Sequence, residues 1–215
     1  MSSRAEPVPR RLVAGVLVLT LVVLGLGGAI VAIKLRPATV PTTAIDRNVE
    51  QWRRAVLANP QDEGARIGLG FALLDAGRTG EARAAFEEAL ELNEKSWIAL
   101  FQLGLLDAEE DPEGALDLLA RAASEAPAGD RTLVLIAQGD LLMAQGDPEG
   151  ARGVYEAAIA DTPFIIDSHL GLARALEALG EEEAALDEYR EAARFDPDNQ
   201  EIADAITRLK GKGKD

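Results

Sequence analysis

The stretch Asp111-Pro112-Glu113-Gly114-Ala115 returns in full as Asp147-Pro148-Glu149-Gly150-Ala151. Around these two copies, residues of similar kind recur in five columns at intervals of 33 to 36 residues. Such a period indicates a repeat protein, in which each unit is one small element stacked on the next. The columns are Gly70, Gly104, Gly139 and Ala173; Ala82, Ala115, Ala151 and Ala185; Phe86, Leu119, Tyr155 and Tyr189; Ala89, Ala122, Ala158 and Ala192; and Pro60, Glu94, Pro127, Pro163 and Pro197.

Each unit is predicted to be a hairpin of two helices. In the first unit, Leu69 and Leu73 lie four residues apart on one helix, Gly77 ends that helix, and Ala82 and Phe86 repeat the spacing on the next. The small residue of the first column lets helices approach closely, and the large residue of the third column fills the groove between them. The proline column ends the second helix, because proline lacks an amide hydrogen and disfavours helix before it.

Composition agrees with an all-α fold and excludes several functions. Aromatic residues are 4% of the chain, and Ala, Leu and Glu, which lose little on entering a helix, are abundant. The absence of cysteine excludes a disulfide framework, a thiolate metal site and a cysteine nucleophile. The net charge is −15, and residues 1–36 carry +4, which leaves −19 for the remainder. Nucleic acid is therefore not an expected partner, because its phosphates repel so acidic a surface.

The columns resemble the tetratricopeptide repeat (TPR), a helical hairpin of 34 residues. The resemblance covers residues 63–199 as four repeats and implies a right-handed α-solenoid that binds other proteins. The chain departs from the family pattern early in the first helix of each repeat, where a large apolar residue is usual but Arg66 and His169 occur in two repeats.

Two spacings also depart from the pattern. Gly104 and Ala115 are one residue closer than their equivalents, which predicts a shortened turn in the second hairpin. Two extra residues stand before Gly139, which predicts a longer loop at residues 128–131.

Partial repeats are expected to cap both ends of the solenoid. Trp52 and Ala55 fall in phase with the third and fourth columns, and Ile202, Ile206 and Leu209 mark the inward face of a last helix. The predicted parts are a cytoplasmic tail at 1–11, a transmembrane helix at 12–33, a linker at 34–44, an N-terminal capping helix (a degenerate half repeat) at 45–62, four repeats at 63–96, 97–129, 132–165 and 166–199, a C-terminal capping helix at 200–210 and a disordered tail at 211–215.

Residues 12–33 predict a membrane span. These 22 residues carry no charge, and as a helix they reach roughly 33 Å, enough for a hydrocarbon core of about 30 Å. A cleaved signal peptide is the alternative, but the apolar run is longer than the usual apolar region of a signal peptide, which has about 7 to 15 residues. Small residues at 27–29 are also followed by more apolar residues, so an uncleaved anchor is favoured.

The orientation of the span follows from its flanking charges. Arg4, Arg10 and Arg11 precede it, whereas Lys34 and Arg36 follow it. Because basic residues stay on the cytoplasmic side, the N-terminus is predicted to be cytoplasmic. The repeat domain would then lie outside the cytoplasm, in the periplasm of a bacterium with two membranes.

The chain offers little for catalysis. His169 is its only histidine, so neither a histidine metal cluster nor a Ser-His-Asp triad can be built. It stands at a helix-packing position, and we interpret it as a structural residue. No glycine-rich phosphate loop occurs. We expect no enzyme activity, no cofactor, no metal and no small-molecule substrate.

The TPR resemblance assigns partner-facing positions to the first helix of each repeat. Most of these positions are apolar, which favours an apolar or amphipathic partner segment and disfavours a lysine- and asparagine-based clamp for a carboxylate. Some of them could instead only pack between helices. The predicted partner-binding residues are Ile67, Phe71, Leu74, Phe101, Leu105, Ile136, Asp140, Met143, Leu170 and Arg174.

Two function classes follow from these observations. The first is a membrane-anchored scaffold or adaptor that binds an envelope protein, resembling the anchored TPR subunits of cytochrome c maturation and of envelope assembly. The second is a structural factor that oligomerises through its own groove. The sequence does not identify the partner.

Overall fold

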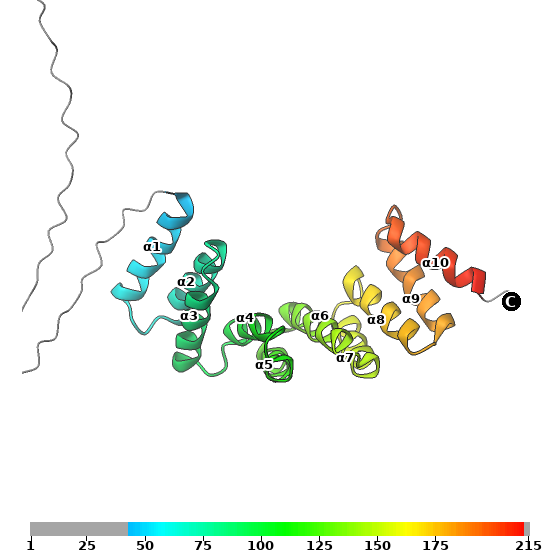
Figure 1. Ribbon diagram of the computed structural model, residues 1–215, viewed down its shortest axis with the longest axis horizontal. Coiled ribbons are helices and arrows are strands. Elements are labelled where there is room, and N and C mark those ends of the chain that lie inside the picture. Colours follow the sequence, from blue (N-terminus) through cyan, green and yellow to red (C-terminus); the bar gives the residue numbers. More distant parts are fainter. Residues whose placement is uncertain (1–42, 213–215) are drawn as a thin grey trace, which may run out of the picture. The chain divides into compact units, whose positions relative to one another are not determined.

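The computed structural model describes residues 43–212, which fold into ten α-helices and no strands (Figure 1). The predicted tail at 1–11, membrane span at 12–33 and most of the linker lie outside the described residues. Within residues 43–212, no helix has the length and apolar character needed to cross a membrane. The helices are α1 (Ala44–Ala58), α2 (Glu63–Asp75), α3 (Thr79–Leu92), α4 (Trp97–Asp107), α5 (Pro112–Glu125), α6 (Ala128–Ala144), α7 (Pro148–Asp161), α8 (Ile166–Ala178), α9 (Glu182–Phe195) and α10 (Gln200–Lys212).

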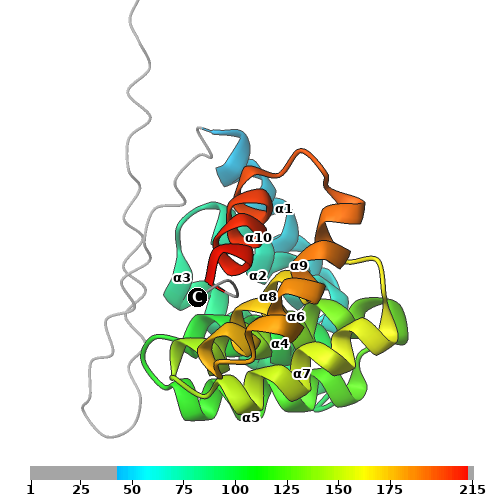
Figure 2. The same cartoon turned by 90° about the vertical axis from the view of Figure 1, so that its right-hand side faces the viewer.

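Helices α2 to α9 form four hairpins that follow the predicted repeats. Within each hairpin the two helices pack together, and each second helix packs against the first helix of the next hairpin. Figure 1 shows α1 and α10 as single helices at the two ends of the stack, and Figure 2 views the same unit from its C-terminal end. This unit of residues 43–212, taken by itself, curves, and α4 and α6 lie on the hollow side of α5 and α7 (Figure 1).

The first and third columns meet inside each hairpin, as predicted. A Cβ atom added to Gly70 would lie 2.5 Å from the Phe86 ring, and one added to Gly139 would lie 2.6 Å from the Tyr155 ring. Phe86 and Tyr155 have 0% and 1% of their surface exposed. The glycines are therefore required by close approach, because any side chain there would occupy the space of the ring.

The repeated Asp-Pro-Glu-Gly-Ala segment begins the second helix of two hairpins. Asp111 and Asp147 are the N-cap residues, and their carboxylates accept hydrogen bonds from the amides of Gly114 at 3.1 Å and Gly150 at 2.9 Å. Proline occupies the start of each helix, where no amide hydrogen is needed. The motif thus encodes a helix start twice.

Three of the four hairpins turn on a glycine in the left-handed region. Gly77, Gly146 and Gly180 have φ of 68°, 76° and 79°. After α2, the amide of Gly77 donates to the Leu74 carbonyl at 2.9 Å and the next amide donates to Leu73 at 2.8 Å, which is the Schellman end of a helix. The prediction of a shorter turn in the second hairpin is wrong. Four residues, 108–111, separate α4 from α5, whereas three residues separate the helices of each other hairpin. The missing residue is lost from the helix instead, because α4 has 11 residues where α2 and α8 have 13, and the turn contains no glycine in the left-handed region.

Two predicted boundaries are wrong. Residues 128–131 are not a loop, because α6 begins at Ala128 and its 17 residues include them. The Pro127 carbonyl accepts hydrogen bonds from the amides of Asp130 and Arg131, both at 2.9 Å, so the extra residues lengthen the helix. Helix α10 runs to Lys212 rather than ending at 210.

Candidate functional site

One exposed side chain stands at the same place on each of five helices. The intervals between these residues are 34, 35, 34 and 34, so they follow the repeat period. All are exposed. We call this set the concave row, since it lies on the first helix of each repeat and on the capping helix. Its members are Phe71 on α2, Leu105 on α4, Asp140 on α6, Arg174 on α8 and Arg208 on α10.

The N-terminal half of the concave row is apolar. Phe71 is 40% exposed and meets the buried Phe86 ring edge-on, with ring centroids 5.6 Å apart. Leu105 is 45% exposed, and Leu133, near the start of α6, is 55% exposed. Large apolar side chains exposed at neighbouring places offer a surface that a partner can cover.

The other predicted partner-binding residues are more buried. Phe101 and Leu170 are only 7% and 8% exposed and belong to the core. Their side chains have little surface left for a partner. Four more are half-buried: Ile67, Leu74, Ile136 and Met143.

The C-terminal half of the concave row is ionic. The Tyr155 hydroxyl donates to the Asp140 carboxylate at 2.6 Å. Arg174 pairs with Glu201 on α10, and this hydrogen bond raises the pKa of the guanidinium. Burial, and then the bond to Asp140, raise the pKa of Tyr155.

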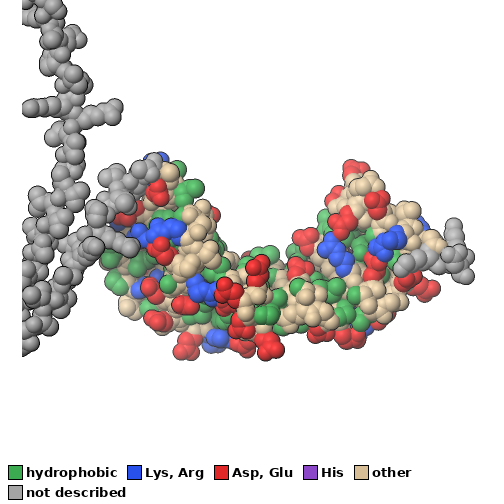
Figure 3. Space-filling view, in the orientation of Figure 1, with side chains coloured by type: hydrophobic (Ala, Val, Ile, Leu, Met, Phe, Trp, Pro, Cys, Tyr) green, Lys and Arg blue, Asp and Glu red, His purple; other side chains and the backbone are tan. Residues whose placement is uncertain are grey.

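A second set of bonds joins α8, α9 and α10. Glu177 accepts a hydrogen bond from the Tyr189 hydroxyl at 2.8 Å and one from Arg208 at 2.9 Å. Burial, and then the bond to Glu177, raise the pKa of Tyr189 to about 12. Figure 3 shows basic and acidic side chains gathered on the C-terminal part of the hollow.

Arg208 and its neighbours are the site residues that the sequence interpretation missed. Arg208 follows Arg174 by one period, so extending the repeat into the capping helix would have found it. It lines an open cleft of about 580 Å³ between α9 and α10. The other lining residues are Tyr189, Glu201, Asp204 and Ala205.

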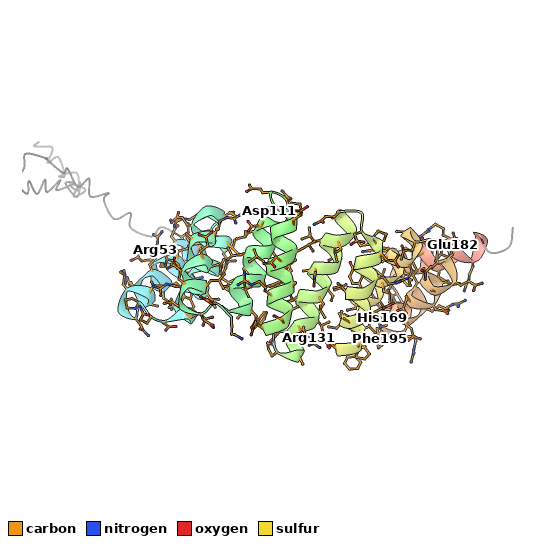
Figure 4. The ribbon with its side chains drawn as sticks, turned by 90° about the horizontal axis from the view of Figure 1, so that it is seen from below. Arg53, Asp111, Arg131, His169, Glu182 and Phe195 are labelled. Carbon is orange, nitrogen blue, oxygen red and sulfur yellow. The ribbon has the colours of Figure 1, made fainter. Side chains whose placement is uncertain are left out.

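His169 lies away from the concave row and is structural, as predicted. It is 6% exposed, its Nδ1 lies 2.7 Å from a Glu188 carboxylate oxygen, and its Nε2 lies 3.0 Å from the Pro163 carbonyl. The Phe195 ring stacks on it with centroids 6.2 Å apart (Figure 4). Within residues 43–212, no group of acidic and histidine side chains is arranged to hold a metal ion.

The fold defines an α-helical repeat solenoid with a row of exposed side chains on the first helices of its repeats. Sequence models of the tetratricopeptide repeat match residues 64–96 and 136–200, so the chain carries TPR units. Residues 97–129, the second hairpin with its short first helix α4, fall between the two matches. No curated protein sequence matches the chain.

Solved TPR structures share the fold. A PilF structure from Pseudomonas aeruginosa is 20% identical with a TM-score of 0.68, covering 79% of this chain and 78% of that chain. YrrB, described as a TPR protein with an unusual peptide-binding site, is 18% identical with a TM-score of 0.66, covering 77% and 85%. MamA is 19% identical with a TM-score of 0.63, covering 74% and 97%. At these identities the likeness concerns the fold alone.

Proposed function

We propose that this chain is a membrane-anchored TPR scaffold that binds a segment of a partner protein along its concave row. The observation that carries the proposal is the row itself, with an exposed side chain at the same repeat position on five successive first helices, the last of them the capping helix. A solenoid presents such equivalent positions as one extended surface, which suits an extended or helical segment better than a small molecule. YrrB, which has the same fold and is described as having a peptide-binding site, supports peptide binding by such a solenoid.

The proposal contains no catalytic step. The single histidine is buried between Glu188 and the Pro163 carbonyl, and the two tyrosines each donate to a carboxylate. Both tyrosine pKa values are raised, so neither phenol supplies a nucleophile near neutral pH. The surface residues of the row are suited to contact, and the work of the protein is to hold a partner.

We also propose where the scaffold works. Residues 12–33 anchor it in the inner membrane with the N-terminus in the cytoplasm and the repeat unit in the periplasm, as the basic residues at the N-terminal end favour. The partner is then an envelope protein or its precursor, and the process is assembly or maturation of envelope proteins, such as cytochromes c. An anchor would confine the scaffold to the membrane surface where such proteins emerge.

Site-specific photocrosslinking tests the proposal. A photoreactive residue replaces Leu105 on the concave row, and a matched variant carries it at Glu87, an exposed residue on α3. Cells producing each full-length variant are irradiated, and adducts are identified by mass. A discrete adduct with another protein at position 105, absent at position 87, supports the scaffold. Equal labelling at both positions would reject the concave row as the binding surface.

The same experiment separates the alternative function. An adduct of twice the mass of this chain, containing only its own peptides, would identify a factor that oligomerises through its own groove. Dilution of the purified full-length chain in detergent would then lower its apparent mass, whereas a scaffold for another protein keeps a constant mass.

A further inference from the structure

The concave row changes from apolar to ionic at α6, and its ionic half has more acid than base. Four carboxylates, those of Asp140, Glu177, Glu201 and Asp204, stand with the two guanidiniums of Arg174 and Arg208. The local balance is therefore two negative charges. Each of the two arginines already pairs with a glutamate, so neither is left to pair with Asp140 or Asp204 directly.

Two of the four carboxylates, those of Asp140 and Asp204, form no direct ion pair among the described residues, although the charge of Asp140 acts on Arg174 from nearby. Among the described residues, Asp140 accepts only the Tyr155 hydroxyl, and Asp204 accepts only the Gln200 side-chain amide at 2.8 Å. Both side chains are exposed. A carboxylate that accepts one neutral hydrogen bond keeps further acceptor sites for a charged donor.

The two arginines and the cleft beside Arg208 surround the place where a partner side chain could reach Asp204. Arg174 bridges α8 to Glu201 on α10, and Arg208 bridges α10 back to Glu177 on α8. These crossed pairs link α8 to α10 and leave half of each arginine side chain exposed. Asp204 lines the cleft of about 580 Å³ beside Arg208, which has room for a long side chain.

We propose, building on the proposed function, that the partner segment is amphipathic and cationic: its apolar side chains contact Phe71 and Leu105, and its lysine or arginine side chains bind Asp140 and Asp204. Charge complementarity favours a cationic segment, because the groups without a direct ion pair in the C-terminal half of the row are the carboxylates of Asp140 and Asp204. The surrounding repeat unit is also acidic. An acidic segment would have to displace Glu177 or Glu201 from the arginines, which costs the bonds already made.

Selection from a phage-displayed library of random peptides tests the inference on the full-length chain in detergent. The expected result is enrichment of peptides that combine large apolar residues with lysine or arginine. The double variant Asp140→Asn, Asp204→Asn should weaken a selected peptide about 10-fold, which corresponds to about 1.4 kcal/mol. It should also flatten the dependence of affinity on salt.

Two controls keep the outcomes distinct. Asp187→Asn removes an exposed carboxylate on α9 that pairs with Arg190, away from the row, and should leave affinity unchanged. Enrichment of acidic peptides, or of peptides without a charge preference that bind the double variant equally well, would overturn the cationic partner while leaving the scaffold intact. Loss of enrichment altogether, or enrichment that Phe71→Ser and Leu105→Ser do not reduce, would contradict the proposed function itself.

Discussion

A Cβ atom placed on Gly171 would lie 2.3 Å from Cε1 of Tyr155, so the phenol ring lies directly against the backbone of α8. The same ring fills the space beside Gly139 in its own hairpin. One side chain thus joins the third repeat to the fourth, and two glycines, one on each side, make room for it. The Tyr155 ring therefore packs both within its own hairpin and against the next one.

Substitution of Gly171 by alanine should therefore destabilise the protein. The Tyr155 ring is 1% exposed and donates its hydroxyl to Asp140, so it has no free space to move into. We expect the free energy of unfolding to fall by about 1–3 kcal/mol, the usual effect of overpacking a core. Urea denaturation of the variant and the natural chain measures the difference.

Gly153→Ala is the matched control, because Gly153 is an exposed residue inside α7 with nothing within 4 Å of an added Cβ. It should raise the free energy of unfolding by about 0.5–1 kcal/mol, since alanine loses less backbone freedom in a helix. Similar effects of the two substitutions would show that contact with Tyr155 does not limit residue size at 171.

The sequence predicted the pairing of Gly139 with Tyr155 because close packing of helices requires a small residue opposite a large one, and the requirement repeats with the period. Burial at Phe101 and Leu170 could not be predicted in the same way. A residue at that position faces both the concave side and the neighbouring helix. Its exposure depends on the angle at which successive hairpins stack, and a column of similar residues in the sequence does not reveal that angle. The prediction of a loop at 128–131 was wrong for a related reason, because extra residues between two repeats can lengthen a helix instead of a loop.

Phe101→Ala should destabilise the protein strongly. The side chain is 7% exposed in a core cluster with Leu119 and Val134, and removing it leaves a cavity. The expected loss is about 3–5 kcal/mol in the free energy of unfolding. Leu105→Ala, at a residue 45% exposed on the same helix, should change stability by about 0.5 kcal/mol or less. Thermal and urea unfolding measure both.

Affinity for a selected peptide, measured on the same two variants, completes this test. Leu105→Ala should weaken binding with stability kept. A stable Phe101→Ala variant that has lost affinity would contradict our placement of Phe101 in the core and return it to the binding surface.

Tyr189 should resist ionisation in the folded protein. Burial and the bond to Glu177 raise its pKa from 10.0 to about 12. Because the unfolded tyrosine keeps the lower value, this contribution to stability is complete below pH 10 and is lost as pH rises toward 12. The chain has two tyrosines, and the pKa of Tyr155 is raised too, so tyrosinate absorbance should show no ionisation step near pH 10 in the folded state.

Glu177→Gln should move the Tyr189 step to lower pH and leave the Tyr155 step in place, because Tyr155 bonds to Asp140 instead. Absorbance of one tyrosinate appearing at pH 10 in the folded natural chain would contradict the burial of Tyr189 against Glu177.

The apolar run at 12–33 should remain in the mature protein. Its 22 uncharged residues exceed the usual apolar region of a signal peptide, and the small residues at 27–29 are followed by more apolar ones. The N-terminus of protein purified from membranes should therefore begin before residue 12, as Edman sequencing or mass spectrometry can establish. A mature chain that starts just after Ala29 would identify a cleaved signal peptide and remove the anchor from the proposal.

Alkaline phosphatase fused after Asp215 should be active, because this enzyme folds only outside the cytoplasm and the repeat unit is proposed to lie there. The orientation rests on Arg4, Arg10 and Arg11 before the apolar run against Lys34 and Arg36 after it. The bias is small, so it can be reversed: replacing Arg10 and Arg11 by asparagine should reduce phosphatase activity as part of the population inserts the other way. A fusion to a cytoplasmic reporter, such as β-galactosidase, should change in the opposite direction. An inactive phosphatase fusion to the natural chain, in protein shown to be membrane-inserted, would place the repeat unit and its partner in the cytoplasm.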